Sequence, residues 1–246
     1  MKQYAIVIVA YFNQEIMNKK LHSIFIGLSF LAIGLAVGLY INGEAKGLKT
    51  NVLESSGTTP EPQKESFEFV SVSADDDAFI GNENAPVTIV EFSDYECYYC
   101  HIFQNQTFPM IYNDYISKGL VKFVYRDFPF TQHQYANLAA EAAECVGESG
   151  DEKYFQMHGM IFARPDEWVG SEDGKSVFVG FAKEIGIDIQ SCIDNGDMKD
   201  EIADDLAAAR SYGVEGTPTF FINGYKVVGA REYALFKEII DKELSK

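Results

Sequence analysis

The amino-acid sequence predicts an α/β domain with a helical insertion in its middle, preceded by one transmembrane helix and a flexible linker. A β-branched run at residues 87–92 leads directly into a segment of helical length, and another strand pattern follows at 120–128. Near the end, the turn Asn223-Gly224 joins two short apolar runs, which is typical of a β-hairpin. A strand, a helix, a strand, a hairpin and a last helix are the elements of an α/β fold.

The composition indicates a packed domain with a strongly acidic character. Hydrophobic residues make up 47% of the 246 residues, so a core can form. The formal net charge of −17 argues against nucleic acid as a partner, because phosphate binding needs a basic face. The four cysteines are too few for a scaffold built on disulfides, but their even number suits two pairs.

An apolar segment near the N-terminus predicts a transmembrane helix. Residues 24–41 contain one clearly polar side chain and are long enough to cross a bilayer as a helix. This length exceeds that of the usual signal-peptide core, which favours an uncleaved anchor over residues 21–42. Lys19 and Lys20 place residues 1–20 in the cytoplasm by the positive-inside rule. A cleavable signal is the alternative, and it would make the domain a secreted one.

Residues 43–66 predict a flexible linker. They are rich in Ser, Thr, Pro and Glu, and such a polar segment cannot bury enough apolar surface to fold by itself. The remaining residues, 67–246, form the predicted globular domain on the extracytoplasmic side. Its helical insertion spans about residues 132–212.

Within this domain, hydrophobic periodicity and turn residues define each element. Pro109 kinks or breaks the first helix, and Gly119 ends it. The predicted strands are residues 67–72, 87–92, 120–128, 219–222 and 226–228. The predicted helices are residues 97–118, 137–146, 154–162, 177–185, 199–212 and 231–244.

Two cysteines stand where the buried strand at 87–92 meets the first helix. Cys97 and Cys100 are separated by two residues, which is the spacing of thiol–disulfide exchange sites. Unpaired N–H groups at the helix start favour a thiolate on Cys97, so Cys97 is the predicted nucleophile and Cys100 the resolving partner. Tyr98 and Tyr99 fill the middle positions, and we expect them to tune the site toward an oxidant of intermediate strength.

A second feature lies about 120 residues further on, in the sequence Gly-Thr-Pro-Thr-Phe-Phe at 216–221. Pro218 stands directly before a strand, so either the start of that strand is exposed or the Thr217–Pro218 bond is cis. A cis bond would leave the backbone of Thr217 free to pair with an extended substrate. Spacing alone leaves both geometries open.

Together these motifs resemble the DsbA-like thiol:disulfide oxidoreductases. The resemblance rests on residues 80–92 (IGNENAPVTIVEF), on the Cys97/Cys100 pair and on residues 216–221, and it covers about residues 75–246. It implies a thioredoxin fold with inserted helices.

The resemblance also implies roles for particular residues. Pro218 would be cis and packed against the disulfide, with Thr217 beside it in the substrate site. Glu91, six residues before Cys97, would be a buried acid that relays protons to and from Cys100. The chain departs from the best-known oxidases of the family, because Tyr-Tyr replaces Pro-His between the cysteines and Thr replaces Val before the proline. These departures leave a disulfide reductase or isomerase open beside an oxidase.

The implied activity is the introduction or exchange of disulfide bonds in proteins outside the cytoplasm. Reduced or unfolded proteins with free cysteines would be the substrates, and no cofactor is needed. A quinone-linked membrane thiol oxidase would reoxidise the reduced pair, and a bilayer anchor would raise the local concentration of that partner.

The other two cysteines, Cys145 and Cys192, fall in the predicted helical insertion. We expect a structural disulfide between them, whose closed loop of about 47 residues would stabilise the domain by roughly 4 kcal/mol. Two buried free thiols are the alternative. No metal site is predicted, because these two cysteines are isolated and do not form the second close pair of a zinc site.

Two rival functions use the same motifs. With His101, the cysteine pair also matches the attachment pattern of c-type haem, so a membrane-tethered electron carrier is an alternative. A redox-inactive module that holds extended chains beside Pro218 is another. The other two histidines of the domain, His133 and His158, have no partners recognisable from the sequence. We expect each to lie at the surface or to be hydrogen-bonded in the core.

Overall fold

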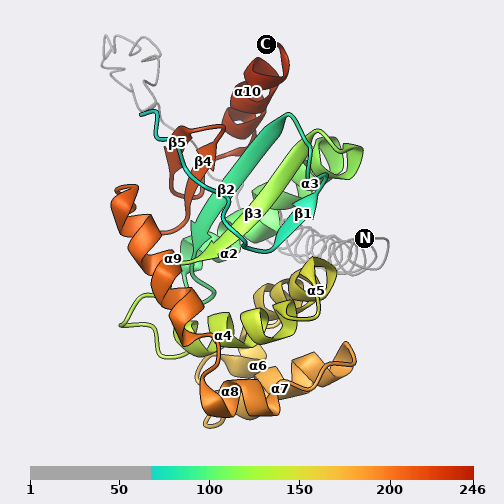
Figure 1. The fold of residues 1–246 in the computed structure, drawn as a ribbon, viewed down its shortest axis with the longest axis vertical. Helices are drawn as coiled ribbons and strands as arrows, with labels where there is room; N and C mark the ends of the chain where they lie inside the picture. Colours follow the sequence, from blue (N-terminus) through green and yellow to red (C-terminus); the bar gives the residue numbers. More distant parts are fainter. Residues whose placement is uncertain (1–67) are drawn as a thin grey trace, which may run out of the picture. The chain divides into compact units, whose positions relative to one another are not determined.

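The computed structural model describes residues 68–246, which form a five-stranded sheet with helices around it (Figure 1). The strand order is β1-β3-β2-β4-β5, with β2 and β3 parallel and the other neighbours antiparallel. The strands are β1 Phe79–Gly81, β2 Val87–Ser93, β3 Val121–Asp127, β4 Thr219–Ile222 and β5 Tyr225–Val228. This is the mixed α/β architecture that the sequence predicts.

The helices fall into two sets. The first consists of α2 Tyr98–Ile102, a π-helix at Phe103–Thr107, α3 Phe108–Asp114, a 3-10 turn at Ile116–Lys118 and α10 Tyr233–Leu244. The second, the helical insertion, consists of α4 Ala136–Gly147, α5 Asp151–Ala163, α6 Pro165–Trp168, α7 Gly174–Glu184, α8 Gln190–Asn195 and α9 Lys199–Ser211. In Figure 1, α4 to α8 gather beyond one end of the sheet, and α9 leads back toward β4.

Strand β2 divides its side chains between the two faces of the sheet, because successive residues of a strand point to opposite sides. Val90 and Phe92 join the apolar cluster that Ala209 of α9 closes. By the same alternation, Glu91 faces the other side, which is filled with aromatic rings. The rings packed against one another there are those of Phe103, Phe108, Phe123, Phe220 and Phe236.

The predicted strand at 67–72 is wrong. Phe69 makes an isolated bridge with Tyr225, and the chain then leaves the edge of the sheet. The apolar side chains that suggested a strand pack against the face of the sheet instead of joining its ladder. They are Val70 and Val72. The first strand is β1, at Phe79–Gly81, which the sequence does not predict.

The other predicted strands and the hairpin are confirmed. Asn223 and Gly224 both have positive φ, at 44° and 92°, as a two-residue hairpin turn with right-handed strand twist requires. The predicted helices of the insertion are also confirmed. Two further helices, α6 and α8, escape the sequence because each has six residues or fewer, too short for a periodic pattern.

The first predicted helix, at 97–118, is divided rather than continuous. The interruption is the π-helix at Phe103–Thr107, and Pro109 then lies in the first turn of α3, where its missing N–H is not needed. Gly119 ends the region with φ at 74°, as predicted.

The predicted membrane anchor cannot be located in the structure. Residues 1–20, the predicted transmembrane helix at 21–42 and the predicted linker at 43–66 lie outside the described residues. Among the helices formed by residues 68–246, none has the length and apolar character that a membrane span needs.

A disulfide ties the insertion together. Cys145 of α4 and Cys192 of α8 are bonded, with Cα atoms 6.0 Å apart. This is the pairing that we expected from the sequence.

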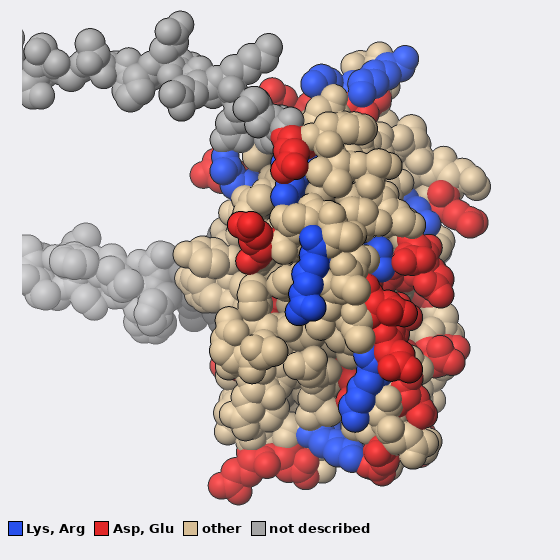
Figure 2. All heavy atoms as spheres, turned by 60° about the vertical axis from the view of Figure 1, so that its left-hand side comes forward, with Lys and Arg blue, Asp and Glu red and all other residues tan. Residues whose placement is uncertain are grey.

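The surface reflects the acidic composition. On the face in Figure 2, Asp and Glu gather along one side and at the base, while Lys and Arg are scattered among neutral residues. That face carries no continuous basic patch of the kind that phosphate binding needs.

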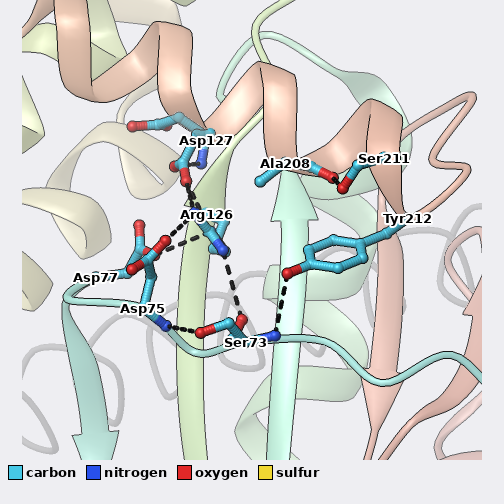
Figure 3. Close-up of polar contacts among 9 residues, drawn as sticks. Ser73, Asp75, Asp77, Arg126, Asp127, Ala208, Ser211 and Tyr212 are labelled. Atoms are coloured by element: carbon cyan, nitrogen blue, oxygen red, sulfur yellow. Dashed lines mark hydrogen bonds and ion pairs between the residues drawn. The ribbon is translucent and has the colours of Figure 1, made fainter.

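Arg126 of β3 links three segments through its buried guanidinium (Figure 3). Its Nε donates to Asp205 of α9 at 2.7 Å and lies 2.9 Å from Asp77. Its Nη2 lies 3.3 Å from Asp75, and its Nη1 donates to the carbonyl of Ser73 at 3.4 Å. The guanidinium therefore holds the segment before β1 and helix α9 against the sheet.

Several carboxyl groups cluster around the guanidinium of Arg126. Within residues 68–246, Asp77, Glu201 and Asp205 come close enough together to share a metal ion, but Arg126 already donates to this cluster. Burial and the neighbouring charge of Asp205 raise the pKa of Asp77 to about 9, against the lowering effect of Arg126. The cluster therefore depends on the single guanidinium for its positive charge.

We predict that Arg126→Met lowers the free energy of unfolding by about 3 kcal/mol, because it leaves the buried carboxyl groups of Asp77 and Asp205 without the guanidinium that they contact. Urea unfolding at pH 7 measures the loss. The control is Arg210→Met on the exposed side of α9, which should change stability by less than about 0.5 kcal/mol. Equal losses in the two variants would contradict the role of Arg126.

Candidate active site

The cysteine pair lies where β2 passes into α2. Cys97 is the residue that precedes the first turn of α2, with an extended backbone (φ −73°, ψ 122°), and Cys100 lies inside the helix. Both are free thiols in this structure. The Cys97 side chain is 8% exposed and that of Cys100 is fully buried, so the sulfur of Cys97 is the more accessible of the two.

The fold brings the proline loop against this pair. The Thr217–Pro218 bond is cis, as the family resemblance implies. The Cys97 sulfur lies 3.5 Å from the carbonyl oxygen of Thr217, although the two residues are 120 positions apart in the sequence. Gly229 donates to the carbonyl of Pro218 at 2.8 Å and fixes the loop to the end of β5.

The two sulfurs have opposite electrostatic environments. A hydrogen bond from the Cys100 thiol lowers the pKa of Cys97 to about 6. Burial opposes this shift, while the side chain of Thr217 and the N–H groups of Cys100 and Tyr99 add to it. Burial, then the neighbouring Cys97, raises the pKa of Cys100 well above its ordinary value. At neutral pH the pair therefore holds one thiolate, on Cys97, and one thiol, on Cys100.

Glu91 is a fully buried acid on the helix-covered face of β2. Burial is the largest cause that raises its pKa, to about 8, and the charge of Cys97 adds to it. Its Oε2 accepts a hydrogen bond from the side-chain amide of Gln104 at 3.2 Å. Glu91 in turn contributes to the raised pKa of Cys100, which places the three groups in one electrostatic unit.

Tyr98 and Tyr99 point outward from this unit. Their side chains are 72% and 59% exposed, and their rings meet edge to face with centroids 5.5 Å apart. The N–H of Tyr99 contributes to the low pKa of Cys97, so this dipeptide touches the sulfur through its backbone. The rings themselves form an apolar surface beside the cysteine pair.

Two acidic residues that the sequence did not single out hold the loop before Cys97. The buried carboxylate of Asp94 accepts from the N–H groups of Glu96 (2.7 Å) and Phe130 (2.8 Å) and contacts His133 Nδ1 at 2.8 Å. The Glu96 carboxylate accepts from the N–H of Tyr135 at 2.8 Å. Acidic residues between a strand and a helix are a weak signal, because their partners lie about 40 residues away.

The histidines within residues 68–246 have partners in the fold. His101 Nε2 lies 2.7 Å from the carbonyl of Tyr95, and its ring packs on Phe162 with centroids 5.0 Å apart. His158 is buried, with Nδ1 3.1 Å from the Tyr95 hydroxyl, and burial lowers its pKa to about 3. Because His101 is held this way and Cys100 is buried, these residues do not fit covalent attachment and ligation of a haem.

Comparison with known proteins agrees with this geometry. A family model described as thioredoxin matches residues 73–242. The chain is 30% identical over 169 residues to disulfide bond formation protein D of Bacillus subtilis, which covers 67% of this chain and 76% of that protein. The structure is similar to that of oxidised BdbD from Bacillus subtilis, with a TM-score of 0.68, 26% identity, and coverage of 74% of this chain and 100% of that one.

A much longer protein contains a segment that is similar in sequence to this chain. The chain is 35% identical over 160 residues to the Na(+)/H(+) antiporter NhaA 3 of Salinispora tropica. That alignment covers 63% of this chain, and the chain spans about a quarter (23%) of the antiporter's length. The transport activity in that name therefore carries no argument for this chain.

We predict that Glu91→Gln changes how the stability of the reduced protein depends on pH. The folded-state pKa of Glu91 is about 8 and its ordinary value is 4.5. The folded protein therefore keeps a proton that the unfolded chain releases between these values, and this contribution to stability is lost as pH rises. The stability of the variant relative to the wild type should increase by about 3 kcal/mol from pH 5 to pH 8.

Urea unfolding of both reduced proteins at the two pH values measures this difference, in which the titration of the cysteines largely cancels. Glu148→Gln, at an exposed position, is the matched control and should follow the wild type. Parallel pH curves for Glu91→Gln and the wild type would rule out the raised pKa.

Proposed function

The chain belongs to the thioredoxin family, and on that premise we propose that it introduces disulfide bonds into proteins outside the cytoplasm. Its described domain is a thiol:disulfide oxidoreductase. The observation that carries the proposal is the asymmetry of the cysteine pair, with the pKa of Cys97 lowered and that of Cys100 raised, beside the Thr217 carbonyl.

The proposed cycle begins with the oxidised pair. A substrate thiolate attacks the sulfur of Cys97, the Cys97–Cys100 bond breaks, and Cys100 leaves as a thiolate that takes a proton from Glu91. A second substrate thiolate then attacks the substrate sulfur of the mixed disulfide and releases the Cys97 thiolate. Two electrons pass from the substrate dithiol to the cysteine pair. The low pKa of Cys97 supports this order, because a stabilised thiolate is the better leaving group.

The proposed substrate site is the surface beside Pro218. An extended chain would pair with the backbone of Thr217 by strand addition, next to the sulfur that it attacks. The 3.5 Å contact between the Cys97 sulfur and the Thr217 carbonyl supports this site. The exposed rings of Tyr98 and Tyr99 lie next to Cys97 in the chain and would contact apolar side chains near the substrate cysteine.

The direction of net electron transfer follows from the stability of the reduced form. A thiolate that is favoured on Cys97 stabilises the reduced pair, which makes the disulfide an oxidant. The backbone N–H of Tyr99 acts on the Cys97 sulfur, and we propose that Tyr98 and Tyr99 give the pair an intermediate redox potential. We therefore propose an oxidase, with exchange or isomerisation of disulfides as a secondary activity.

We propose that the domain works at the outer side of a membrane. The apolar run at residues 24–41 supports an anchor over 21–42, and a quinone-linked membrane thiol oxidase would accept the electrons from the reduced pair. Substrates would be reduced or unfolded proteins with free cysteines, and no cofactor takes part. Alkaline carbonate extraction of cells that express the whole chain tests the anchor, and release into the soluble fraction would contradict it.

Oxidation of a reduced two-cysteine peptide tests the function. We predict that Cys97→Ser abolishes it, since the attacked sulfur is gone, while the double variant Cys145→Ser/Cys192→Ser keeps the rate of the wild type per folded molecule. The potential of the pair in glutathione buffers should lie between about −120 and −270 mV, nearer the first. A value at the negative end, or full activity in Cys97→Ser, would defeat the proposal.

A further inference from the structure

We propose that Gln104 is a positioning residue for the proton relay, whose side-chain amide holds the Glu91 carboxyl in the orientation that exchanges a proton with Cys100. The inference rests on the proposed function of the cysteine pair. It concerns one residue of the π-helix that neither the cysteine motif nor the proline loop includes.

The geometry singles out Gln104 among its neighbours. Gln104, Asn105 and Gln106 are three consecutive amide side chains, of which Asn105 and Gln106 are exposed and Gln104 is 8% exposed. The amide Nε2 of Gln104 donates to Oε2 of Glu91 at 3.2 Å. A buried amide is costly unless it is hydrogen-bonded, so this contact explains why one of the three points inward.

The π-helix fixes the depth of that side chain. Phe103, one residue before Gln104, is fully buried and packs on Phe220 with ring centroids 4.3 Å apart. At the other end, the Thr107 hydroxyl donates to the carbonyl of Arg231 at 3.1 Å. Both ends of the turn are therefore fastened to the fold. A π-turn inserts one residue into a helix and is frequently found at functional sites.

The titratable groups around Glu91 offer its carboxylate no positive charge, so a hydrogen bond from a neutral donor is the stabilisation open to it. The titratable groups that face Glu91 from the elements packed against it are Cys97 and Cys100 from α2 and its start, and Tyr125 from the paired position of β3. Each of these is neutral or negative, and among the described residues no cation contributes to the pKa of Glu91. The Ser93 side chain and, after it, the Gln104 amide lower that pKa against burial, which holds it at about 8.

The ionised form of Glu91 matters in the step that closes the disulfide. When Cys97 carries a mixed disulfide, the Cys100 thiol attacks the Cys97 sulfur and its proton passes to the Glu91 carboxylate. The Cys97–Cys100 bond forms, the bond from Cys97 to the other sulfur breaks, and that sulfur leaves as a thiolate. Without the amide, only Ser93 would still lower the pKa of Glu91, so Glu91 would keep its own proton to higher pH and accept this one less readily near neutral pH.

The test is the release of glutathione from the mixed disulfide of Cys97 with glutathione, followed by rapid acid quench and mass spectrometry from pH 5 to pH 9. Gln104→Met keeps the length of the side chain and removes the donor. We expect its pH midpoint to rise by about one unit, with release about ten-fold slower below the midpoint and unchanged at pH 9. Gln106→Met, exposed in the same turn, is the matched control and should follow the wild type.

A second variant and a second background separate positioning from packing. Gln104→Asn keeps an amide but withdraws it from the carboxyl, and should shift the midpoint in the same direction. In a Glu91→Gln background, Gln104→Met should cause no further shift. Slowing that is equal at all pH values, or that persists without Glu91, would overturn the inference. If the mixed disulfide of the wild type releases no glutathione, the proposed function itself fails.

Discussion

The hydrogen bond from the buried thiol of Cys100 to the sulfur of Cys97 is the interaction on which the site depends. It stabilises a negative charge on Cys97, and it does so because burial keeps Cys100 protonated. The same burial keeps water away from the Cys100 thiol. Glu91 is a buried acid beside this pair, and in the proposed cycle it exchanges the proton with Cys100; the side-chain amide of Gln104 donates to its carboxyl group.

The fold supplies rigidity around that pair of sulfurs. Asp94 and Glu96 accept backbone N–H groups of the segment after β3 and so fasten the loop before Cys97. At greater distance, Arg126 joins β3 to α9 and to the segment before β1. These contacts use charged groups in the interior, which is costly unless each is paired. The part of the fold that positions Cys97 is therefore stabilised by buried polar contacts as well as by apolar packing.

Local patterns predicted much of this protein. The strand-to-helix junction at Cys97, the hairpin turn at Asn223-Gly224 and the longer helices of the insertion follow from periodicity and turn residues within short windows. The alternating segment at 67–72 misled the prediction, because alternation reports which side chains are buried and not whether the backbone joins a ladder. Packing on a sheet face and pairing at its edge leave the same pattern.

The sequence by itself determined the chemistry, since a Cys-x-x-Cys pair after a buried strand and the Gly-Thr-Pro loop are local arrangements that the residues spell out. Tertiary structure alone decided which groups serve that chemistry. Three contacts join residues from separate elements. They are those of Cys97 with Thr217, of Gln104 with Glu91 and of Asp94 with Phe130. Such contacts depend on how the elements pack, and a proton-exchanging acid acquires its pKa from burial, which no local pattern records.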